Sequence, residues 1–369
     1  MRIITFYLLK AFLKPLLLCL ISFNAIFIIF DLFGNLSNFI EAGTSIPVVL
    51  RYYGGVVSMY AQWFLPASCL LAALYTMWQL SHHSELTAMR ASGISFYLLL
   101  VPFLVASVGM SLLSLWNSEY IAPEASVWSE RLKESSFTTA ESQEKKNVQF
   151  ISPSTGRTWM FASVDPSTEY TMARPSGSVD VIQEVDGVKV SGVHAKRAEY
   201  LDGVWWFHEP RPIEYDIDGQ ELPQESSKAI PDNAPKRVPM HELVESPRSM
   251  MLEHRSAYFK FFLLSDMLLY IKGRKVPDKG QWYEFWYRIA SPWACVVITI
   301  FAIPAGISTG RKSVMKGVIM ALLAFFSFYA LTLALSFLAF HGIIPAAPAA
   351  LLPNLVFLVI GVSMFRKLT

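Results

Sequence analysis

The residues that would carry nucleotide chemistry are the glycine, lysine and serine in the segment 306–313, GISTGRKS. A phosphate-binding loop needs four residues between its glycines and a strand before it. Here three residues separate the glycines, Arg311 precedes Lys312, and the segment follows an apolar helix. We interpret it as a helix end with a glycine stop and basic anchors. No nucleotide site is predicted, so an ATP-driven process would need an ATPase on another chain.

The histidines and cysteines lack the spacing of a catalytic or metal-binding site. Four histidines of the central polar region occur singly, without an HExxH motif or paired ligands: His194, His208, His241 and His254. All three cysteines lie in apolar stretches and favour packing over a disulfide framework: Cys19, Cys69 and Cys295. We therefore predict no catalytic residue, no metal and no cofactor.

The segment 84–93, SELTAMRASG, is a polar break between two long apolar stretches. We expect Ser84 to be the N-cap of a short helix, with Glu85 in its positive first turn and Arg90 near its negative last turn. Gly93 would supply the left-handed stop. The pattern predicts a short helix inside a loop that otherwise only reverses the chain.

Leu86 and Met89 lie three residues apart in this segment and would share one helix face. The helix would thus carry an apolar knob flanked by charges. Two interpretations fit: a turn that lies on the lipid surface, or a docking helix inserted into a groove of a cytoplasmic partner.

The elements around this break are those of a membrane protein. The chain has 369 residues, of which 53% are hydrophobic and 16% charged, too apolar for an ordinary soluble protein. A spanning helix needs roughly 20 apolar residues. Six stretches qualify: about 11–33, 56–79, 96–117, 288–308, 315–340 and 346–365. The first exceeds a signal-peptide core and lacks a small-residue cleavage site, so we expect it to be retained.

Lysine and arginine in the short loops set the expected orientation. Cations fall on one side if there are six spans: Arg2, Lys10, Lys14, Arg90, Arg311, Lys312, Lys316, Arg366 and Lys367. The opposite short loops hold only Arg51. Both termini should be cytoplasmic and the large insert outside. The net charge of +2 gives no case for nucleic-acid binding.

The insert has the pattern of an all-β domain. Short β-rich runs are broken by Gly, Pro, Asp or Asn, which favours an antiparallel sandwich or jelly roll. VDGVK and YLDGVWW each predict a hairpin. The adjacent Trp205, Trp206 and Phe207 must point to both faces of a strand. A proline-rich stretch would be an extended edge or linker, and a helix at about 255–272 would pack near the membrane without spanning it.

These features resemble the lipopolysaccharide export permeases of the LptF/LptG type. SHHSELTAMRASGIS is similar to the family's coupling helix, and VHAKRAEYLDGVWWF to a strand pair of its exported domain. Further stretches resemble its spans: FDLFGNLSNFIEAG, FLPASCLLAALYTMWQLS, YEFWYRIASPWACVVITIFAIPAGI and LLPNLVFLVIGVSMFRK. The resemblance covers almost the whole chain, and the DLF…FIEAG stretch leans toward LptG.

The resemblance implies an architecture and a set of partners. It implies an α-helical membrane protein with spans 1–3 in 1–118, including the coupling helix 84–93. An exported β-jelly roll and return helix would occupy 119–283, and spans 4–6 would occupy 284–369. The chain would pair with a paralogous permease subunit over a dimeric cytoplasmic ABC ATPase. It would pass lipopolysaccharide from the bacterial inner membrane to periplasmic jelly-roll bridge proteins.

The resemblance also implies roles for particular residues. Glu85 would pair with an arginine of the ATPase, Leu86 and Met89 would fill its groove, and Ser84 and Gly93 would shape the helix. The first and fifth spans would line a cavity for acyl chains. The side chains this suggests are Phe23, Phe27, Phe30, Phe325, Phe326 and Tyr329, with Asp31 at the outer end of the first span.

One departure from the family concerns charge. LptG-type members carry lysines near the outer end of the first span, whereas this stretch carries Asp31 and Glu41, with Arg51 as the nearest cation. Either the partner subunit meets the lipid's charges or the cargo is less phosphorylated. Three alternatives remain: a membrane-anchored scaffold that binds partners without transport, a lipoprotein-releasing permease, against which six spans argue, and an exported hydrolase, for which no nucleophile–base pair is visible.

Overall fold

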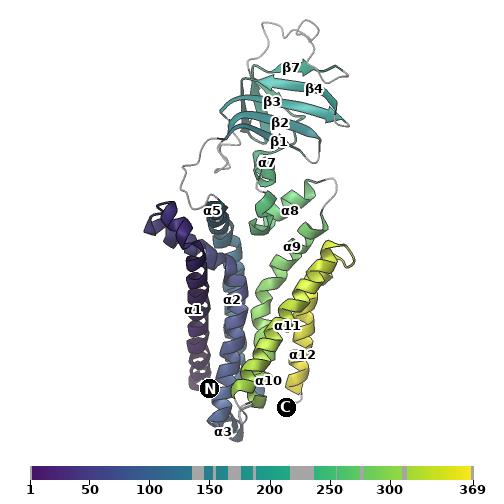
Figure 1. Cartoon of the computed structure of the whole chain (residues 1–369). Helices are drawn as coiled ribbons and strands as arrows, with labels where there is room; N and C mark the ends of the chain where they lie inside the picture. Colours follow the sequence, from purple (N-terminus) through teal and green to yellow (C-terminus); the bar gives the residue numbers. More distant parts are fainter. Residues whose placement is uncertain are drawn as a thin grey trace. The chain divides into compact units, whose positions relative to one another are not determined.

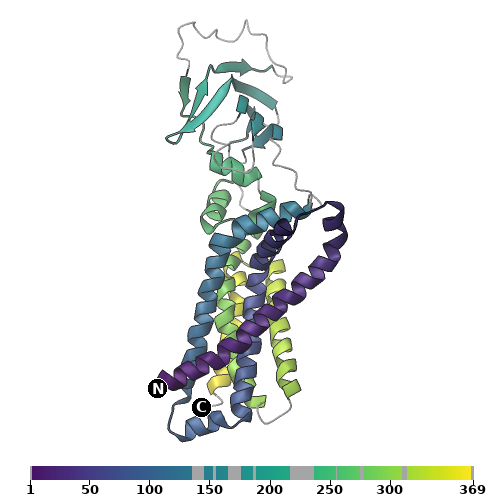
Figure 2. The same ribbon diagram turned by 90° about the vertical axis from the view of Figure 1, so that its left-hand side faces the viewer.

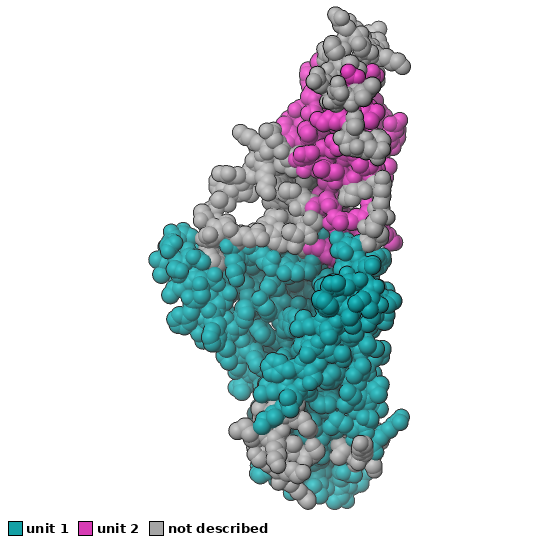
Figure 3. All heavy atoms as spheres, turned by 45° about the vertical axis from the view of Figure 1, so that its right-hand side comes forward, with its two compact units in different colours: residues 1–139, 260–264, 278–369 teal, residues 140–259, 265–277 magenta. Residues whose placement is uncertain are grey.

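The chain forms two compact units in a computed structural model. The described residues are 2–134, 145–152, 155–164, 176–185, 188–216, 237–254, 256–274, 278–309 and 314–366. The membrane unit comprises residues 1–139, 260–264 and 278–369, and the β-unit comprises 140–259 and 265–277 (Figure 3). The predicted boundaries at 118/119 and 283/284 both fall inside helical segments of the membrane unit.

Six helical segments of the described chain are long and apolar enough to cross a membrane, as the sequence predicts (Figure 1). Four of them are single helices: α1 (Arg2–Glu41), α2 (Ile46–His82), α11 (Val314–Phe340) and α12 (Ala346–Arg366). The fourth span is built from α9 (Lys279–Ala290), the 3₁₀ turn η3 (Ser291–Trp293) and α10 (Ala294–Thr309). Helices α1 and α2 run well beyond the predicted 11–33 and 56–79, and continue through Gly34 and the Gly54-Gly55 pair that stand at two of those limits.

The third span continues past its predicted end. Helix α4 (Phe96–Trp116) runs through a π-helical turn, η1 (Asn117–Ile121), into α5 (Ala122–Glu134). Pro123 lies two residues after η1 ends, and proline has no N–H to donate to the helical ladder. A π-turn accommodates such an irregularity without ending the helix. The region assigned to the start of the insert is therefore helical.

The membrane unit has a continuous apolar core. On α1, Leu8, Phe12 and Leu16 are buried in one stripe four residues apart. Helices α2 and α10 approach closely at Gly306, where an added Cβ would lie 2.7 Å from Cβ of Met77. Figure 2 shows α1 crossing the other helices at an angle. Most of its large side chains beyond the stripe are exposed.

The β-unit contains two antiparallel sheets. The first has the order β1-β2-β3-β4-β7 and the second β5-β6-β8. The strands are β1 (Lys145–Ile151), β2 (Arg157–Val164), β3 (Ser176–Val185), β4 (Val188–Ala195), β5 (Arg197–Leu201), β6 (Val204–His208), β7 (Arg211–Glu214) and β8 (Arg237–Met240). Trp159 and Phe161 of the first sheet share one core with Trp205 and Phe207 of the second.

The hairpin and alternation predictions for this unit are confirmed where the structure describes them. Asp202 and Gly203 both have positive φ and join β5 to β6 as a two-residue turn. The Asp-Gly turn between β3 and β4 lies outside the described residues. Trp205 and Phe207 point inward, whereas the guanidinium of Arg237 covers the ring of Trp206 at 4.6 Å. Pro239 lies in the edge strand β8, where a missing N–H is tolerated.

The predicted helix at 255–272 is instead divided. A 3₁₀ segment, η2 (Ser256–Phe261), precedes the nine-residue helix α8 (Leu264–Lys272), and α7 (Pro247–His254) forms before both. Pro247 occupies the first position of α7, where proline is favoured. Helix α8 is too short to span a bilayer.

Candidate functional site

The polar break forms the short helix α3 (Glu85–Ala91) between α2 and α4. Its end matches the prediction, since Gly93 has a φ of +84° and donates its N–H to the carbonyl of Arg90. Its start differs. Ser84 has a φ of 58° in the left-handed region and its side chain accepts no capping hydrogen bond, because capping needs an extended backbone at that position.

The apolar side chains of α3 face the chain's own core, and the prediction that they fill a partner's groove stays a prediction. Leu86 is 6% exposed and belongs to the same core cluster as Leu8 and Phe12 of α1. Met89 is half-buried against that cluster. The rest of α3 forms a small exposed face. Its residues include Thr87, Ala88, Arg90 and Ala91.

Glu85 is held by the first helix. The hydroxyl of Tyr7 on α1 donates a hydrogen bond of 2.7 Å to Oε2 of Glu85. The two residues are 78 positions apart in sequence, so only the folded chain brings them together. Sequence reasoning missed Tyr7, which looks like one more aromatic in an apolar helix.

The aromatic residues predicted on the first span divide into two groups. Phe23 and Phe27 are half-buried against α2, with ring centroids 6.2 Å and 5.8 Å from that of Phe64. Phe27 also lies 4.4 Å from Tyr60. Phe30, in contrast, is 75% exposed. Of the three, Phe30 is the most exposed side chain.

Asp31 lies in a polar cluster at the far end of α1 from Tyr7. Nζ of Lys133 on α5 is 3.9 Å from its carboxylate, and the hydroxyl of Tyr52 donates to the carboxylate at 3.3 Å. Arg51, the first cation after this stretch of the sequence, instead stacks on the ring of Trp128 at 4.3 Å. Sequence reasoning missed Lys133 because its position was assigned to the exported domain.

The residues predicted on the fifth span also divide. Phe326 is 64% exposed, Phe325 is half-buried, and Tyr329 is 8% exposed. The ring of Tyr329 packs 4.5 Å from that of Trp63 on α2. The helical bundle of this chain therefore encloses the Tyr329 side chain, and its predicted place in a lipid cavity between two subunits stays a prediction.

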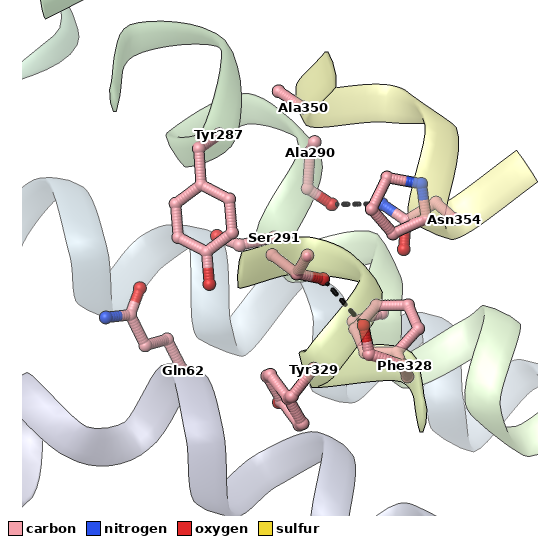
Figure 4. A pocket seen from close by; sticks show the side chains of 11 residues that line it. Gln62, Tyr287, Ala290, Ser291, Phe328, Tyr329, Ala350 and Asn354 are labelled. Carbon is pink, nitrogen blue, oxygen red and sulfur yellow. Dashed lines mark hydrogen bonds between the residues drawn. The ribbon is translucent and has the colours of Figure 1, made fainter. Parts of the chain in front are cut away.

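Tyr329 instead lines a small polar pocket inside the helical bundle (Figure 4). Gln62 of α2 and Tyr287 of α9 lie across from it, and Asn354 of α12 closes another side (Figure 4). Nδ2 of Asn354 donates to the carbonyl of Ala290 at 2.8 Å. Among the described residues, the Tyr329 hydroxyl and Oδ1 of Asn354 have no hydrogen-bond partner. Polar residues such as Gln62 and Asn354, which interrupt apolar helices, are the feature of the sequence that could have indicated this pocket.

No group of three His, Cys, Asp or Glu side chains in the described part of the chain is placed to hold a metal ion. His194 contacts the carboxylate of Asp180 across β3 and β4 through Nδ1, which is a cross-strand side-chain pair.

These elements define a multi-pass helical membrane protein that carries an inserted antiparallel β-unit. The family model for "Lipopolysaccharide export system permease LptF/LptG" matches residues 6–367, so the chain belongs to this family. It is therefore a membrane component of lipopolysaccharide export. The match does not separate LptF from LptG. A comparison with curated proteins gives no match.

Proposed function

We propose that the chain is the transmembrane permease subunit of an ABC transporter that extracts lipopolysaccharide from the inner membrane. A separate ATPase supplies the work, and a periplasmic bridge receives the lipid. The observation that carries this proposal is the family match over 6–367, together with a short helix in the loop between the second and third spans.

Helix α3 is the proposed docking point for a dimeric cytoplasmic ATPase. Its exposed residues Thr87, Ala88 and Arg90 make the outward face, and Glu85 offers a carboxylate to an arginine of the ATPase. Leu86 would support this face from behind rather than enter the partner. Since α3 rests on the core shared by α1 and α2, force applied to it reaches the spans.

The proposed lipid path runs along α1 and α11, opposite a paralogous subunit with the same architecture. Phe30 and Phe326 are exposed there, while Phe23, Phe27 and Phe325 would form the wall behind them. Lys133 and Arg51, placed on α5 and α2, would take the role of the family's lysines toward the lipid's phosphates. Asp31 would orient Lys133.

The β-unit is the proposed periplasmic jelly-roll domain, and both termini would be cytoplasmic by the distribution of loop lysines and arginines. Three spans precede this unit and three follow it. The outer strands of its two sheets, β1 and β7 in one and β5 and β8 in the other, offer edges for pairing with a jelly-roll bridge protein.

Two experiments test the proposal. Depletion in the source cell should make mature lipopolysaccharide accumulate at the inner membrane. In vesicles that hold the complete complex, Glu85→Ala should weaken ATPase association and ATP-driven lipid release. Glu41→Ala, which removes an exposed carboxylate from the other end of α1, is the matched control. Unchanged association and release in Glu85→Ala would contradict the docking role, and an absence of lipid accumulation would contradict the cargo.

A further inference from the structure

The carboxylate of Glu85 contacts α1 and is also accessible at the surface. Tyr7 donates its hydroxyl to Oε2 at 2.7 Å. A carboxylate has about four acceptor positions, so Oε1 and the remaining lone pairs stay available to a cation. One group can thus bind Tyr7 and an arginine at the same time.

Tyr7 belongs to the part of α1 that is firmly packed. The next residue, Leu8, begins the buried stripe that continues through Phe12 and Leu16. Leu86 of α3 lies in the same core cluster. The start of α1 and the whole of α3 therefore share one packed region, and the Tyr7–Glu85 hydrogen bond joins them at its surface.

The rest of α1 is held differently. Beyond Leu16, Phe39 is the next strongly buried apolar side chain on this helix. Between them, Phe23 and Phe27 touch α2 by their rings, and large residues such as Ile26, Ile29 and Phe30 are exposed. A displacement applied at Tyr7 would therefore act on a helix that is packed near both ends and loosely held between Leu16 and Phe39.

We propose that Tyr7 is a positioning residue that transmits the motion of α3 directly to α1, the proposed wall of the lipid path. This inference rests on the proposed function, in which α3 receives the ATPase. When an arginine docks, it removes water from the Glu85 carboxylate, and a hydrogen bond in a drier environment is stronger. The Tyr7 link thus tightens when the ATPase engages.

Tyr7→Phe tests this link because it removes the hydroxyl and leaves the ring. The matched control is Tyr75→Phe on α2: its side chain is 50% exposed against 47% for Tyr7. Within the described part of the chain, Tyr75 makes no side-chain hydrogen bond. Both variants are assembled with the ATPase and partner subunit in vesicles containing lipopolysaccharide. ATP hydrolysis and lipid release are then measured together.

We expect Tyr7→Phe to keep ATP hydrolysis while lipid released per ATP falls about three- to ten-fold, as for loss of one typical hydrogen bond at an exposed site. The control should match the unsubstituted complex. This ratio isolates coupling, because a purely structural defect would lower hydrolysis and release together. Equal ratios in Tyr7→Phe and Tyr75→Phe would overturn the inference.

A double-variant cycle with Glu85→Ala gives a second test that does not depend on one variant. Alanine leaves Tyr7 no side-chain acceptor at position 85, so if Tyr7 acts through Glu85, adding Tyr7→Phe to Glu85→Ala should lower the ratio little further. If the losses of the two single variants instead multiply in the double variant, the inference is overturned while the docking role stands. A Glu85→Ala complex with unchanged ATPase association would contradict the docking role in the proposed function.

Discussion

Arg288 of α9 and Glu119 of η1 form an ion pair inside the membrane unit, with Nε of the arginine 3.5 Å from Oε1 of the carboxylate. The arginine side chain is 9% exposed and the glutamate side chain 20%. Both residues also make hydrogen bonds to the backbone. Arg288 donates to the carbonyls of Lys260 and Ser118, and Glu119 accepts the backbone N–H of Leu264 at 3.3 Å. The third span, the fourth span and the segment 260–264 therefore meet at one charged junction.

Removing one member of this pair should be costly. Arg288→Met leaves Glu119 with a half-buried, uncompensated charge and should lower the free energy of unfolding by about 3 kcal/mol. Lys260→Met removes an ion pair with Glu130 whose lysine is 53% exposed, so it should cost less than about 1 kcal/mol. Thermal unfolding of the purified subunit in detergent compares the two. Similar melting temperatures would show that the junction does not hold the spans together.

Two adjacent glycines on α2 should respond in opposite ways to alanine. A Cβ on Gly55 would collide with the Ser129 hydroxyl and lie 2.5 Å from the carbonyl oxygen of Ala125, whereas Gly54 has nothing within 4 Å. Gly55→Ala should therefore separate α2 from α5 at a cost of about 1–3 kcal/mol. Gly54→Ala should be neutral or stabilising by up to about 1 kcal/mol, as alanine favours a helix. Thermal unfolding of the two variants checks the pair, and a neutral Gly55→Ala would rule out the close crossing.

Because Leu86 is buried and Ala88 is exposed, substitutions at these two positions of α3 should affect stability and docking separately. Leu86→Ala should lower the free energy of unfolding of the isolated subunit by about 2–5 kcal/mol, as for other buried leucines. Ala88→Asp, on the exposed side, should change it by no more than about 0.5 kcal/mol yet reduce co-purification with the ATPase. Melting curves and pull-down yields measure the two effects. If the Leu86→Ala subunit keeps normal stability but no longer co-purifies with the ATPase, Leu86 enters the partner's groove after all.

The polar pocket predicts different roles for two of its residues. Tyr329→Phe should change stability by less than about 1 kcal/mol, because the hydroxyl has no partner among the described residues. Asn354→Leu removes the hydrogen bond to the Ala290 carbonyl and should cost about 1–3 kcal/mol by leaving that carbonyl unpaired. Thermal unfolding again provides the comparison. A large loss in Tyr329→Phe would mean that an ordered water bonds to the hydroxyl and belongs to the structure.

The spans and hairpins could be predicted from the sequence because each depends on local properties. A run of apolar residues fixes a spanning helix, and the Asp202-Gly203 pair fixes a turn between two strands. Gly93 ends α3 for the same local reason. The extension of the third span through α5 was missed because the sequence there becomes polar while remaining helical.

The arrangement of the site could not be predicted in the same way. The contact of Tyr7 with Glu85 joins residues 78 positions apart, and Lys133 reaches Asp31 from a region that looked like the start of another domain. The inward direction of Leu86 follows from how α3 rests on α1 and α2. Spacing within a seven-residue helix shows that two side chains share a face, but not which neighbour that face meets.

The length of α1 has a consequence for the energetics of lipid removal. Its 40 residues extend about 60 Å at 1.5 Å per residue, twice the roughly 30 Å of a bilayer's hydrocarbon core. Apolar side chains continue almost to its end, with Phe33 and Ile40 both strongly exposed. Each methylene that leaves hydrocarbon for water costs about 0.8 kcal/mol. If the apolar surface of α1 continues beyond the headgroups, acyl chains that follow it would leave the hydrocarbon a few methylenes at a time. The total transfer free energy would then be divided into smaller steps.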